Sequence, residues 1–308
     1  MTIFKSRTLS LALALSLTLP FAAAQEQEGN IASHTDVPYV ADGSKAHLLD
    51  LYLPEKAEKP SPVVVFIHGG GWMTGHKGSA GLSKVSGLHR LMKSLREQGY
   101  AVAALNYRLS GEAPFPAQLE DVQTALQWIA DNAKEYHLDS SRIALTGDSA
   151  GSHLAQLAAV KQQGDSIRAV LSFYGVSDIG NVNAERLAKN CPETIQQLMG
   201  KLMDNPPDNT PEGLLLNEPF HSVAFFQKAI DASPIYFVSG KTPPMQLVHG
   251  DDDCWVPHVQ SVKMHDALKQ AGVDSELVIL EGIGHAATRF YDEDINAKTL
   301  EFLNKHME

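Results

Sequence analysis

Ser149 is the residue whose surroundings point most directly to chemistry. It stands between Gly147 and Gly151, where an apolar run ends and a helical run begins. Gly-x-Ser-x-Gly at such a junction is typical of a strand-to-helix turn so tight that only glycine fits two residues on either side, and the turn points the serine hydroxyl out of the sheet. Because glycine and serine each make up about 7% of residues, chance places this pattern in about one chain in ten of this length. The partners of Ser149 therefore decide what it does.

A nucleophilic serine needs a base, and the base needs an acid that orients it. In proteins with this turn, the acid and then the histidine follow the serine in the sequence, each on a loop after a later strand. His285 lies in a glycine-containing loop directly after the last apolar run, at Leu277–Leu280. The chain has 13 histidines, so the position of His285, and not its residue type, makes it the candidate base.

The acid has three adjacent candidates, Asp251, Asp252 and Asp253, which follow the apolar run Gln246–Val248. Three consecutive carboxylates cannot all face one imidazole, and the residues alone leave the choice among them open. Consecutive acids also suggest calcium, but no loop of spaced oxygen ligands accompanies them. We therefore expect no metal site and no cofactor.

The glycine run at His68–Gly71 supplies a second requirement of acyl transfer. Glycines let backbone N–H groups come close to a developing oxyanion, and the N–H of Ala150, the residue after the serine, completes such a hole. The alternative, a phosphate cradle, lacks both the Gly-Lys-Ser/Thr ending and a G-x-G-x-x-G sequence leading into a helix.

These residues lie within a regular alternation of strands and helices. Edge strands are expected within Asp36–Tyr52. Further strands are expected at Val63–Ile67, Tyr100–Tyr107, Arg142–Thr146, Ala169–Tyr174, Met245–His249 and Glu276–Glu281. Helices are expected at Gly81–Gln98, Gln118–Tyr136, Ser152–Lys161, Val262–Ala271 and Asp294–His306. Alternation of this kind predicts an α/β fold with a mostly parallel central sheet and helices on both faces.

The segment from Ser177 to Ser233 interrupts the alternation. It is long and rich in proline, with helical patterns at Ala184–Lys189, Pro192–Met203 and Val223–Ile230. We interpret it as a cap-like insertion over the site, the alternative being an ordinary elaborate crossover. The aromatic side chains of Phe220, Phe225, Phe226, Trp72 and Trp255 are candidates to bind substrate, although those in the insertion could equally attach the cap to the rest of the fold.

The first 24 residues read as a secretory signal peptide. Lys5 and Arg7 precede the apolar run Leu9–Leu19, and Ala22–Ala24 forms the cleavage pattern. This run is too short for a permanent bilayer anchor. We expect residues 25–308 to form one domain in the periplasm or outside the cell, without stable membrane insertion. The net charge of −11 argues against nucleic acid as a partner.

The two cysteines, Cys191 and Cys254, are an even pair in a chain expected to be exported. In an oxidising compartment such a pair is a candidate disulfide. The alternative is two unrelated buried thiols. A bridge would join the predicted cap to the residue that follows Asp253.

Seven motifs give the chain a resemblance to a known family. They are Leu49–Pro54, His68–Trp72, Asn106–Leu109, Phe115–Val122, Gly147–Gly151, His249–Pro257 and Gly284–His285. In this order they are similar to the α/β-hydrolases that cleave alkyl esters. Within that superfamily the chain resembles the hormone-sensitive-lipase-like carboxylesterases and the BD-FAE group, which includes feruloyl and other short-acyl esterases.

The resemblance implies roles for particular residues. In the family pattern H-G-x-x-D-x-x-V-P the aspartate is the catalytic acid, which here is Asp253. By the same matching, Gly70, Gly71 and Ala150 donate their N–H groups to the oxyanion. His68 is expected to shape that loop and to take no part in proton transfer.

The resemblance also implies an activity. We expect a serine carboxylesterase that forms an acyl-enzyme on Ser149, with Asp253 and His285 completing the triad. Its substrate would be a short-acyl or aromatic ester of feruloyl or acetyl type, either a small molecule or linked to a polysaccharide. The alternatives are a serine peptidase of the prolyl-oligopeptidase type, which usually has a large additional domain, and a non-catalytic ligand-binding α/β-hydrolase.

Overall fold

A computed structural model describes residues 32–79, 87–162, 164–197, 210–219 and 222–308. Within these residues, eight strands form one sheet in the spatial order β1-β2-β4-β3-β5-β6-β7-β8. The strands are β1 (His34–Pro38), β2 (Leu48–Tyr52), β3 (Ser61–Ile67), β4 (Ala101–Leu105), β5 (Leu138–Asp148), β6 (Ile167–Phe173), β7 (Met245–Gly250) and β8 (Ser275–Leu280). Strand β2 runs antiparallel to both β1 and β4, and all other neighbours are parallel. The predicted mostly parallel sheet is confirmed.

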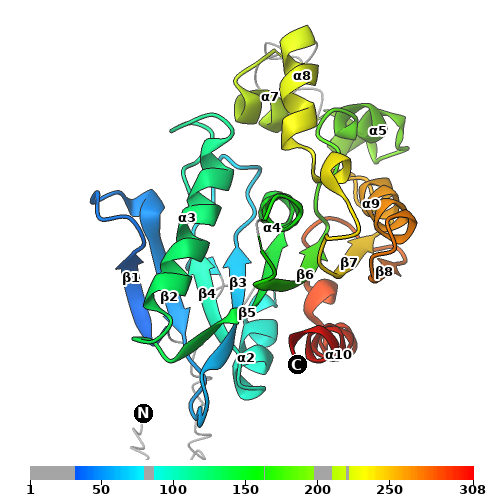
Figure 1. The fold of residues 1–308 in the computed structure, drawn as a ribbon. Coiled ribbons are helices and arrows are strands. Elements are labelled where there is room, and N and C mark those ends of the chain that lie inside the picture. The colour runs from blue at the N-terminus through cyan, green and yellow to red at the C-terminus, as the bar shows by residue number, and fades with distance from the viewer. Residues whose placement is uncertain (1–31, 80–86, 163, 198–209, 220–221) are drawn as a thin grey trace, which may run out of the picture.

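Helices cover both faces of the sheet (Figure 1). The helices are α2 (Leu88–Glu97), α3 (Ala117–Asn132), α4 (Ala150–Val160), α5 (Val182–Ala188), α7 (Pro211–Leu216), α8 (Val223–Ala232), α9 (Val259–Gln270) and α10 (Glu293–Met307). Short 3-10 turns are η1 (Lys45–His47), η3 (Pro234–Phe237) and η4 (Thr288–Tyr291). Side chains on one face of the sheet pack on α3, α4 and α9, and those on the other face pack on α2 and α10.

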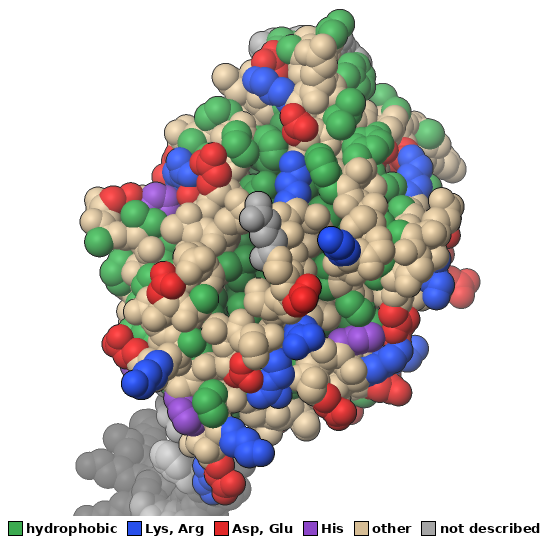
Figure 2. Space-filling view, viewed as in Figure 1, with side chains coloured by type: hydrophobic (Ala, Val, Ile, Leu, Met, Phe, Trp, Pro, Cys, Tyr) green, Lys and Arg blue, Asp and Glu red, His purple; other side chains and the backbone are tan. Residues whose placement is uncertain are grey.

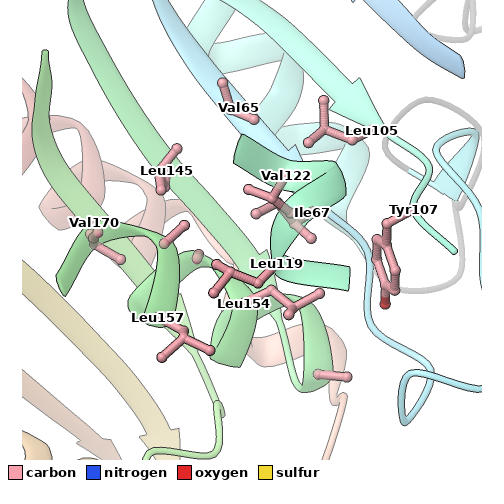
Figure 3. Packing of buried hydrophobic residues seen from close by; sticks show 14 of the residues in the cluster. Val65, Ile67, Leu105, Tyr107, Leu119, Val122, Leu145, Leu154, Leu157 and Val170 are labelled. Carbon is pink, nitrogen blue, oxygen red and sulfur yellow. The ribbon is translucent and has the colours of Figure 1, made fainter. Parts of the chain in front are cut away.

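The central strand β3 shows why the sheet needs two layers of helices. Val63, Val65 and Ile67 belong to the cluster with α3 and α4, whereas Val64 and Phe66 belong to the cluster with α2 and α10. Alternate side chains of a strand point to opposite faces, so a strand that is apolar at every position requires cover on both sides. Figure 3 shows the first cluster, in which strand side chains meet α3 and α4.

The strand register brings the candidate site residues to one edge of the sheet. Ile67, at the end of β3, pairs with Gly147 near the end of β5, so the chain leaves both strands at the same edge. At the other side of the sheet, Gly250 at the end of β7 pairs with Leu280 at the end of β8. The loops that follow β3, β5, β7 and β8 therefore leave the sheet at the same edge. These loops carry the glycine run, the serine, the candidate acid and the candidate histidine.

Several element boundaries differ from the sequence predictions by a few residues, and β5 and α2 are two examples. Strand β5 begins at Leu138, not at Arg142, because Leu138 and Asp139 already pair with Ser61 and Pro62 before a shift in register. Helix α2 begins at Leu88, with Gly87 before it. The first part of the helix predicted at 81–98 lies outside the described residues.

The segment predicted to form a cap, residues 177–233 (the cap segment below), contains α5, α7 and α8. These helices lie beyond the sheet at one end of the molecule (Figure 1). Apolar side chains gather over this part of the face shown in Figure 2, and Val223, Phe226 and Ile230 of α8 are 75%, 46% and 53% exposed. Of the predicted aromatic residues, Phe225 is fully buried and Phe220 lies outside the described residues.

The predicted signal peptide also lies outside the described residues. In the part of the chain that the structure describes, no helix is long and apolar enough to cross a membrane.

Candidate active site

Ser149 sits in a strained turn between β5 and α4. Its backbone has φ 53° and ψ −118°, a region that residues with a side chain rarely adopt. A Cβ on Gly147 would lie 2.5 Å from the carbonyl carbon of Gly151, and a Cβ on Gly151 would lie 2.0 Å from the carbonyl oxygen of Ile67. No side chain fits at either position, which explains both glycines of the pattern.

Ser149, His285 and Asp253 form one hydrogen-bonded chain. Ser149 Oγ is 3.0 Å from Nε2 of His285, and Nδ1 of His285 is 2.6 Å from Oδ2 of Asp253. The serine comes from the end of β5, the acid from the loop after β7 and the histidine from the loop after β8. Gly250 permits the close approach of the last two loops, since a Cβ there would lie 2.0 Å from the carbonyl oxygen of Ile283. The arrangement can transfer a proton from the serine to the histidine.

The three adjacent carboxylates have different surroundings. Asp253 is fully buried, and its Oδ1 accepts hydrogen bonds of 2.8 and 2.9 Å from the N–H groups two and three residues further on. Asp251 accepts a bond of 2.6 Å from the N–H of Gly282, which joins the acid loop to the histidine loop. Asp252 is exposed. Of the three carboxylates, Asp253 is the one hydrogen-bonded to His285. Among the described residues no group of three or more His, Cys, Asp or Glu side chains is placed to hold a metal ion.

His249 is a further residue beside the acid, with no role expected from the sequence. It is fully buried, with Nε2 2.8 Å from the carbonyl oxygen of Val256 and 3.3 Å from Oδ2 of Asp253. Both neighbours are acceptors, so Nε2 carries the proton, while Nδ1 accepts from the hydroxyl of Ser261 at 2.7 Å. The signal for His249 was its place as the first residue of H-G-x-x-D.

The charge of Asp253 is stabilised by two histidines. Burial by itself raises the pKa of this carboxyl, but hydrogen bonds from His249 and His285 outweigh burial and hold the pKa well below its ordinary value. Asp253 therefore remains a carboxylate at neutral pH. A carboxylate beside Nδ1 fixes the tautomer in which Nε2 of His285 faces the serine without a proton.

The glycine run after β3 lies beside the serine. Gly70 and Gly71 have φ angles of 111° and 60°, and a Cβ on Gly70 would lie 2.2 Å from the carbonyl oxygen of Thr74. The run is fixed to the serine turn by Asp148, whose Oδ1 accepts a 3.0 Å hydrogen bond from the N–H of Gly69. Ala150 is the first residue of α4, so its N–H has no acceptor within the helix.

His68 packs against the glycine loop and helps to hold its conformation. Its ring is buried and stacks on Tyr107, with centroids 4.3 Å apart, and its Nδ1 lies 2.8 Å from the carbonyl oxygen of Gly69. Burial lowers the pKa of His68 to about 4, so the ring is neutral at neutral pH. This geometry agrees with the expectation that His68 shapes the loop.

The side chain of Trp72, a predicted substrate contact, points into the core. Its side chain is 2% exposed and packs in the core, and its indole N–H donates a 3.2 Å hydrogen bond to Nδ1 of His153. In this structure the indole ring faces His153 and the core, and has almost no exposure to solvent. Trp255 is partly buried beside the two cysteines, and its binding role stays a prediction.

Three links join α5 and the residues after it to the acid loop. Cys191 and Cys254 form a disulfide between positions 63 residues apart. Nε of Arg186 donates to the carbonyl oxygen of Trp255 at 2.8 Å, and Nζ of Lys189 donates to that of Asp251 at 2.5 Å. The cap segment thus contacts the residues on both sides of Asp253.

Loss of the disulfide is expected to destabilise the fold. In the loop-entropy model, closing a loop of this length lowers the entropy of the unfolded chain by an amount worth about 4 kcal/mol. We expect the double variant Cys191→Ala/Cys254→Ala to lose free energy of unfolding of that order in urea titrations without reductant. Reductant should then destabilise the wild type and leave the variant unchanged. Equal stability of the two proteins without reductant would contradict the prediction.

Acid is expected to destabilise the fold because of two buried histidines. Burial lowers the pKa of His68 and of His153 from 6.5 to about 4. Between these values the unfolded chain binds a proton at each ring and the folded chain does not. Stability is therefore complete above pH 6.5 and falls toward pH 4, by up to about 3 kcal/mol per histidine at about 1.36 kcal/mol per pKa unit.

Urea unfolding at pH 7 and pH 4.5 measures this effect. Between these pH values His153→Gln should lose about 2 kcal/mol less than the wild type, since glutamine does not titrate. Equal losses in both proteins would contradict a lowered pKa at His153.

The fold and the site together define the class of the protein. A mostly parallel sheet with helices on both faces, a strained serine after a central strand, and an acid and a histidine after two later strands are the features of an α/β-hydrolase. A family model described as BD-FAE matches residues 49–268, and the chain belongs to this family.

Curated relatives are esterases by name. The chain is 31% identical over 257 residues to Esterase LipQ of Mycobacterium tuberculosis, in an alignment that covers 78% of this chain and 54% of LipQ. It is 29% identical over 252 residues to isoprenylcysteine alpha-carbonyl methylesterase ICME of Arabidopsis thaliana, covering 77% of this chain and 53% of ICME. The chain thus spans about half the length of these relatives.

Solved structures show the same fold. A truncated form of a carbohydrate esterase from gut microbiota is similar with a TM-score of 0.73 at 26% identity, covering 90% of this chain and 98% of that one. Bifunctional GH43-CE of Bacteroides eggerthii gives a TM-score of 0.74 at 28% identity, covering 89% of this chain and 35% of that one.

Proposed function

We propose that the protein is a serine carboxylesterase. The observation that carries the proposal is the chain of hydrogen bonds from Ser149 Oγ through His285 to Asp253, with separations of 3.0 and 2.6 Å. Membership of the BD-FAE family and the names of the curated relatives support it.

The reaction has two halves. His285 takes the proton of Ser149 as the hydroxyl oxygen attacks the ester carbonyl, and the N–H groups of Gly70, Gly71 and Ala150 donate to the oxyanion. The carbon–oxygen bond to the alcohol then breaks, and the alcohol leaves with the proton from His285. Water attacks the resulting acyl-enzyme in the same way, which releases the acid and restores Ser149.

We further propose short-acyl or aromatic esters as substrates, of acetyl or feruloyl type and including esters on polysaccharides. The similarity at 26% identity to a carbohydrate esterase over nearly its whole chain supports this class. Trp255, partly buried beside the acid loop, is a candidate contact for an aromatic group.

We place the protein in the periplasm or outside the cell. The signal-peptide pattern of residues 1–24 supports export. The bond between Cys191 and Cys254 supports an oxidising compartment, because cytosolic proteins rarely keep structural disulfides. Cell fractionation with detection of the protein, and N-terminal sequencing of the product, test this proposal.

A substrate panel tests the activity. We expect turnover of p-nitrophenyl acetate, methyl ferulate and acetylated xylan, and little turnover of Gly-Pro-type amides. Faster amide than ester cleavage would favour a peptidase of the prolyl-oligopeptidase type. Binding of an ester without turnover would favour a ligand-binding protein.

A further inference from the structure

The oxyanion loop is anchored by a side chain that the reaction itself does not use. Trp72 directly follows Gly71 and has a left-handed backbone with φ 59°. Its buried indole donates its N–H to Nδ1 of His153 at 3.2 Å, and the two rings meet edge to face with centroids 5.2 Å apart. His153 stands on the first turn of α4, four residues after Ser149. The bond therefore joins the loop that holds the oxyanion donors to the helix that carries the nucleophile.

The cap segment determines which nitrogen of His153 accepts this bond. Nε2 of His153 lies 2.6 Å from the carbonyl oxygen of Ala232, the last residue of α8. A carbonyl oxygen can only accept, so Nε2 carries the proton and Nδ1 has the lone pair that the indole N–H requires. The ring is fully buried, and burial lowers the pKa of His153 to about 4, so it remains neutral at neutral pH.

A glycine run needs such an anchor. Glycines have more backbone freedom than other residues, yet oxyanion donors stabilise a transition state only when they are fixed before the reaction. Asp148 holds the start of the run through Gly69. Trp72 holds its end, where a Cβ added at Gly71 would lie 3.6 Å from Cβ of Pro211 at the start of α7.

We propose that His153 and Trp72 are positioning residues that align the oxyanion loop with Ser149, and that Ala232 in the cap segment keeps His153 in the tautomer that accepts the Trp72 bond. The proposal rests on the esterase function proposed above. It also connects the cap to catalysis, because displacement of α8 would free the imidazole that anchors the loop.

Two replacements of His153 separate the two bonds. The side-chain amide of asparagine can place its oxygen near the position of Nδ1, which keeps an acceptor for Trp72 and removes the donor to Ala232. Glutamine can place its amide nitrogen near the position of Nε2, which keeps the donor and removes the acceptor. Trp72→Phe removes the indole N–H and retains an aromatic ring in the core.

The readout is kcat and KM for p-nitrophenyl acetate. We expect Trp72→Phe and His153→Gln each to lower kcat about tenfold with KM nearly unchanged, a smaller loss than the ~10²–10³-fold that follows removal of a whole oxyanion donor. His153→Asn, which keeps the acceptor for Trp72, should lose less kcat than His153→Gln. The double variant Trp72→Phe/His153→Gln should lose no more than either single variant, because both remove the same bond.

Controls distinguish a failure of this proposal from a failure of the esterase function on which it rests. Wild-type turnover that Ser149→Ala abolishes establishes the esterase independently. Trp128→Phe on α3 makes the same replacement away from the site and should leave kcat unchanged, and thermal unfolding reports whether each variant folds. Three results would each overturn the proposal. The first is an unchanged kcat in Trp72→Phe, and the second is an equal loss of kcat in His153→Asn and His153→Gln. The third is a double variant whose loss of kcat is the product of the two single losses.

Discussion

Replacing Ser149 by alanine is expected to lower kcat about 10⁶-fold, the loss typical when the nucleophile of a serine hydrolase is removed. Alanine has no oxygen to attack the ester carbonyl, so no acyl-enzyme can form. The fold should persist, since the left-handed backbone at position 149 is retained by the packing of Gly147 and Gly151. Initial rates of p-nitrophenyl acetate hydrolysis at enzyme concentrations high enough to detect slow turnover measure the loss.

The matched control is Ser94→Ala on α2, on the opposite face of the sheet from α4. We expect it to keep the activity of the wild type. Thermal unfolding of Ser149→Ala at a temperature close to that of the wild type would show that its inactivity is chemical. Substantial turnover by folded Ser149→Ala would exclude Ser149 as the nucleophile.

Asp253→Asn is expected to lower kcat about 10⁴-fold. Asparagine can turn its amide N–H toward Nδ1 of His285, which stabilises the tautomer with the proton on Nε2. That tautomer cannot take the proton of Ser149. In the proposed mechanism the buried carboxylate, 2.6 Å from Nδ1 of His285, also stabilises the imidazolium formed during attack.

The adjacent carboxylates provide the control for this prediction. Asp252 is exposed, and Asn at position 251 can still accept the N–H of Gly282 through its amide oxygen. Asp251→Asn and Asp252→Asn should each stay close to wild-type kcat. A loss in Asp252→Asn as large as that in Asp253→Asn would contradict the assignment of the acid.

The sequence predicts the strands and the edge of the sheet at which the candidate catalytic residues lie, because both follow from local patterns. Val63–Ile67 is apolar at every position, which indicates a strand covered on both faces, and the two core clusters confirm it. Ser149, Asp253 and His285 each follow the end of a parallel strand, so the sequence alone indicates that they lie at the same edge of the sheet. The residues alone leave the three adjacent carboxylates open, and the family resemblance favours Asp253. In the structure Asp253 is fully buried and accepts two backbone hydrogen bonds.

Other parts of the site depend on contacts that no local pattern contains. Trp72 stands next to the oxyanion glycines, which favours a substrate contact, yet its ring turns into the core to meet His153, 81 residues away. His153 in turn contacts Ala232, 79 residues further along. His249 reaches Asp253 only because the loop after β7 folds back on itself. Tertiary packing determines where the side chains of Trp72, His153 and His249 point.

Covalent labelling of the serine tests the central claim most directly. A p-nitrophenyl phosphonate should react so that a bond forms between phosphorus and Oγ of Ser149 while p-nitrophenolate leaves. We expect one p-nitrophenolate per active chain, loss of activity in proportion to the label, and a mass increase confined to the peptide that contains Ser149. A label on a different residue, or full activity after Ser149 is completely modified, would contradict the account.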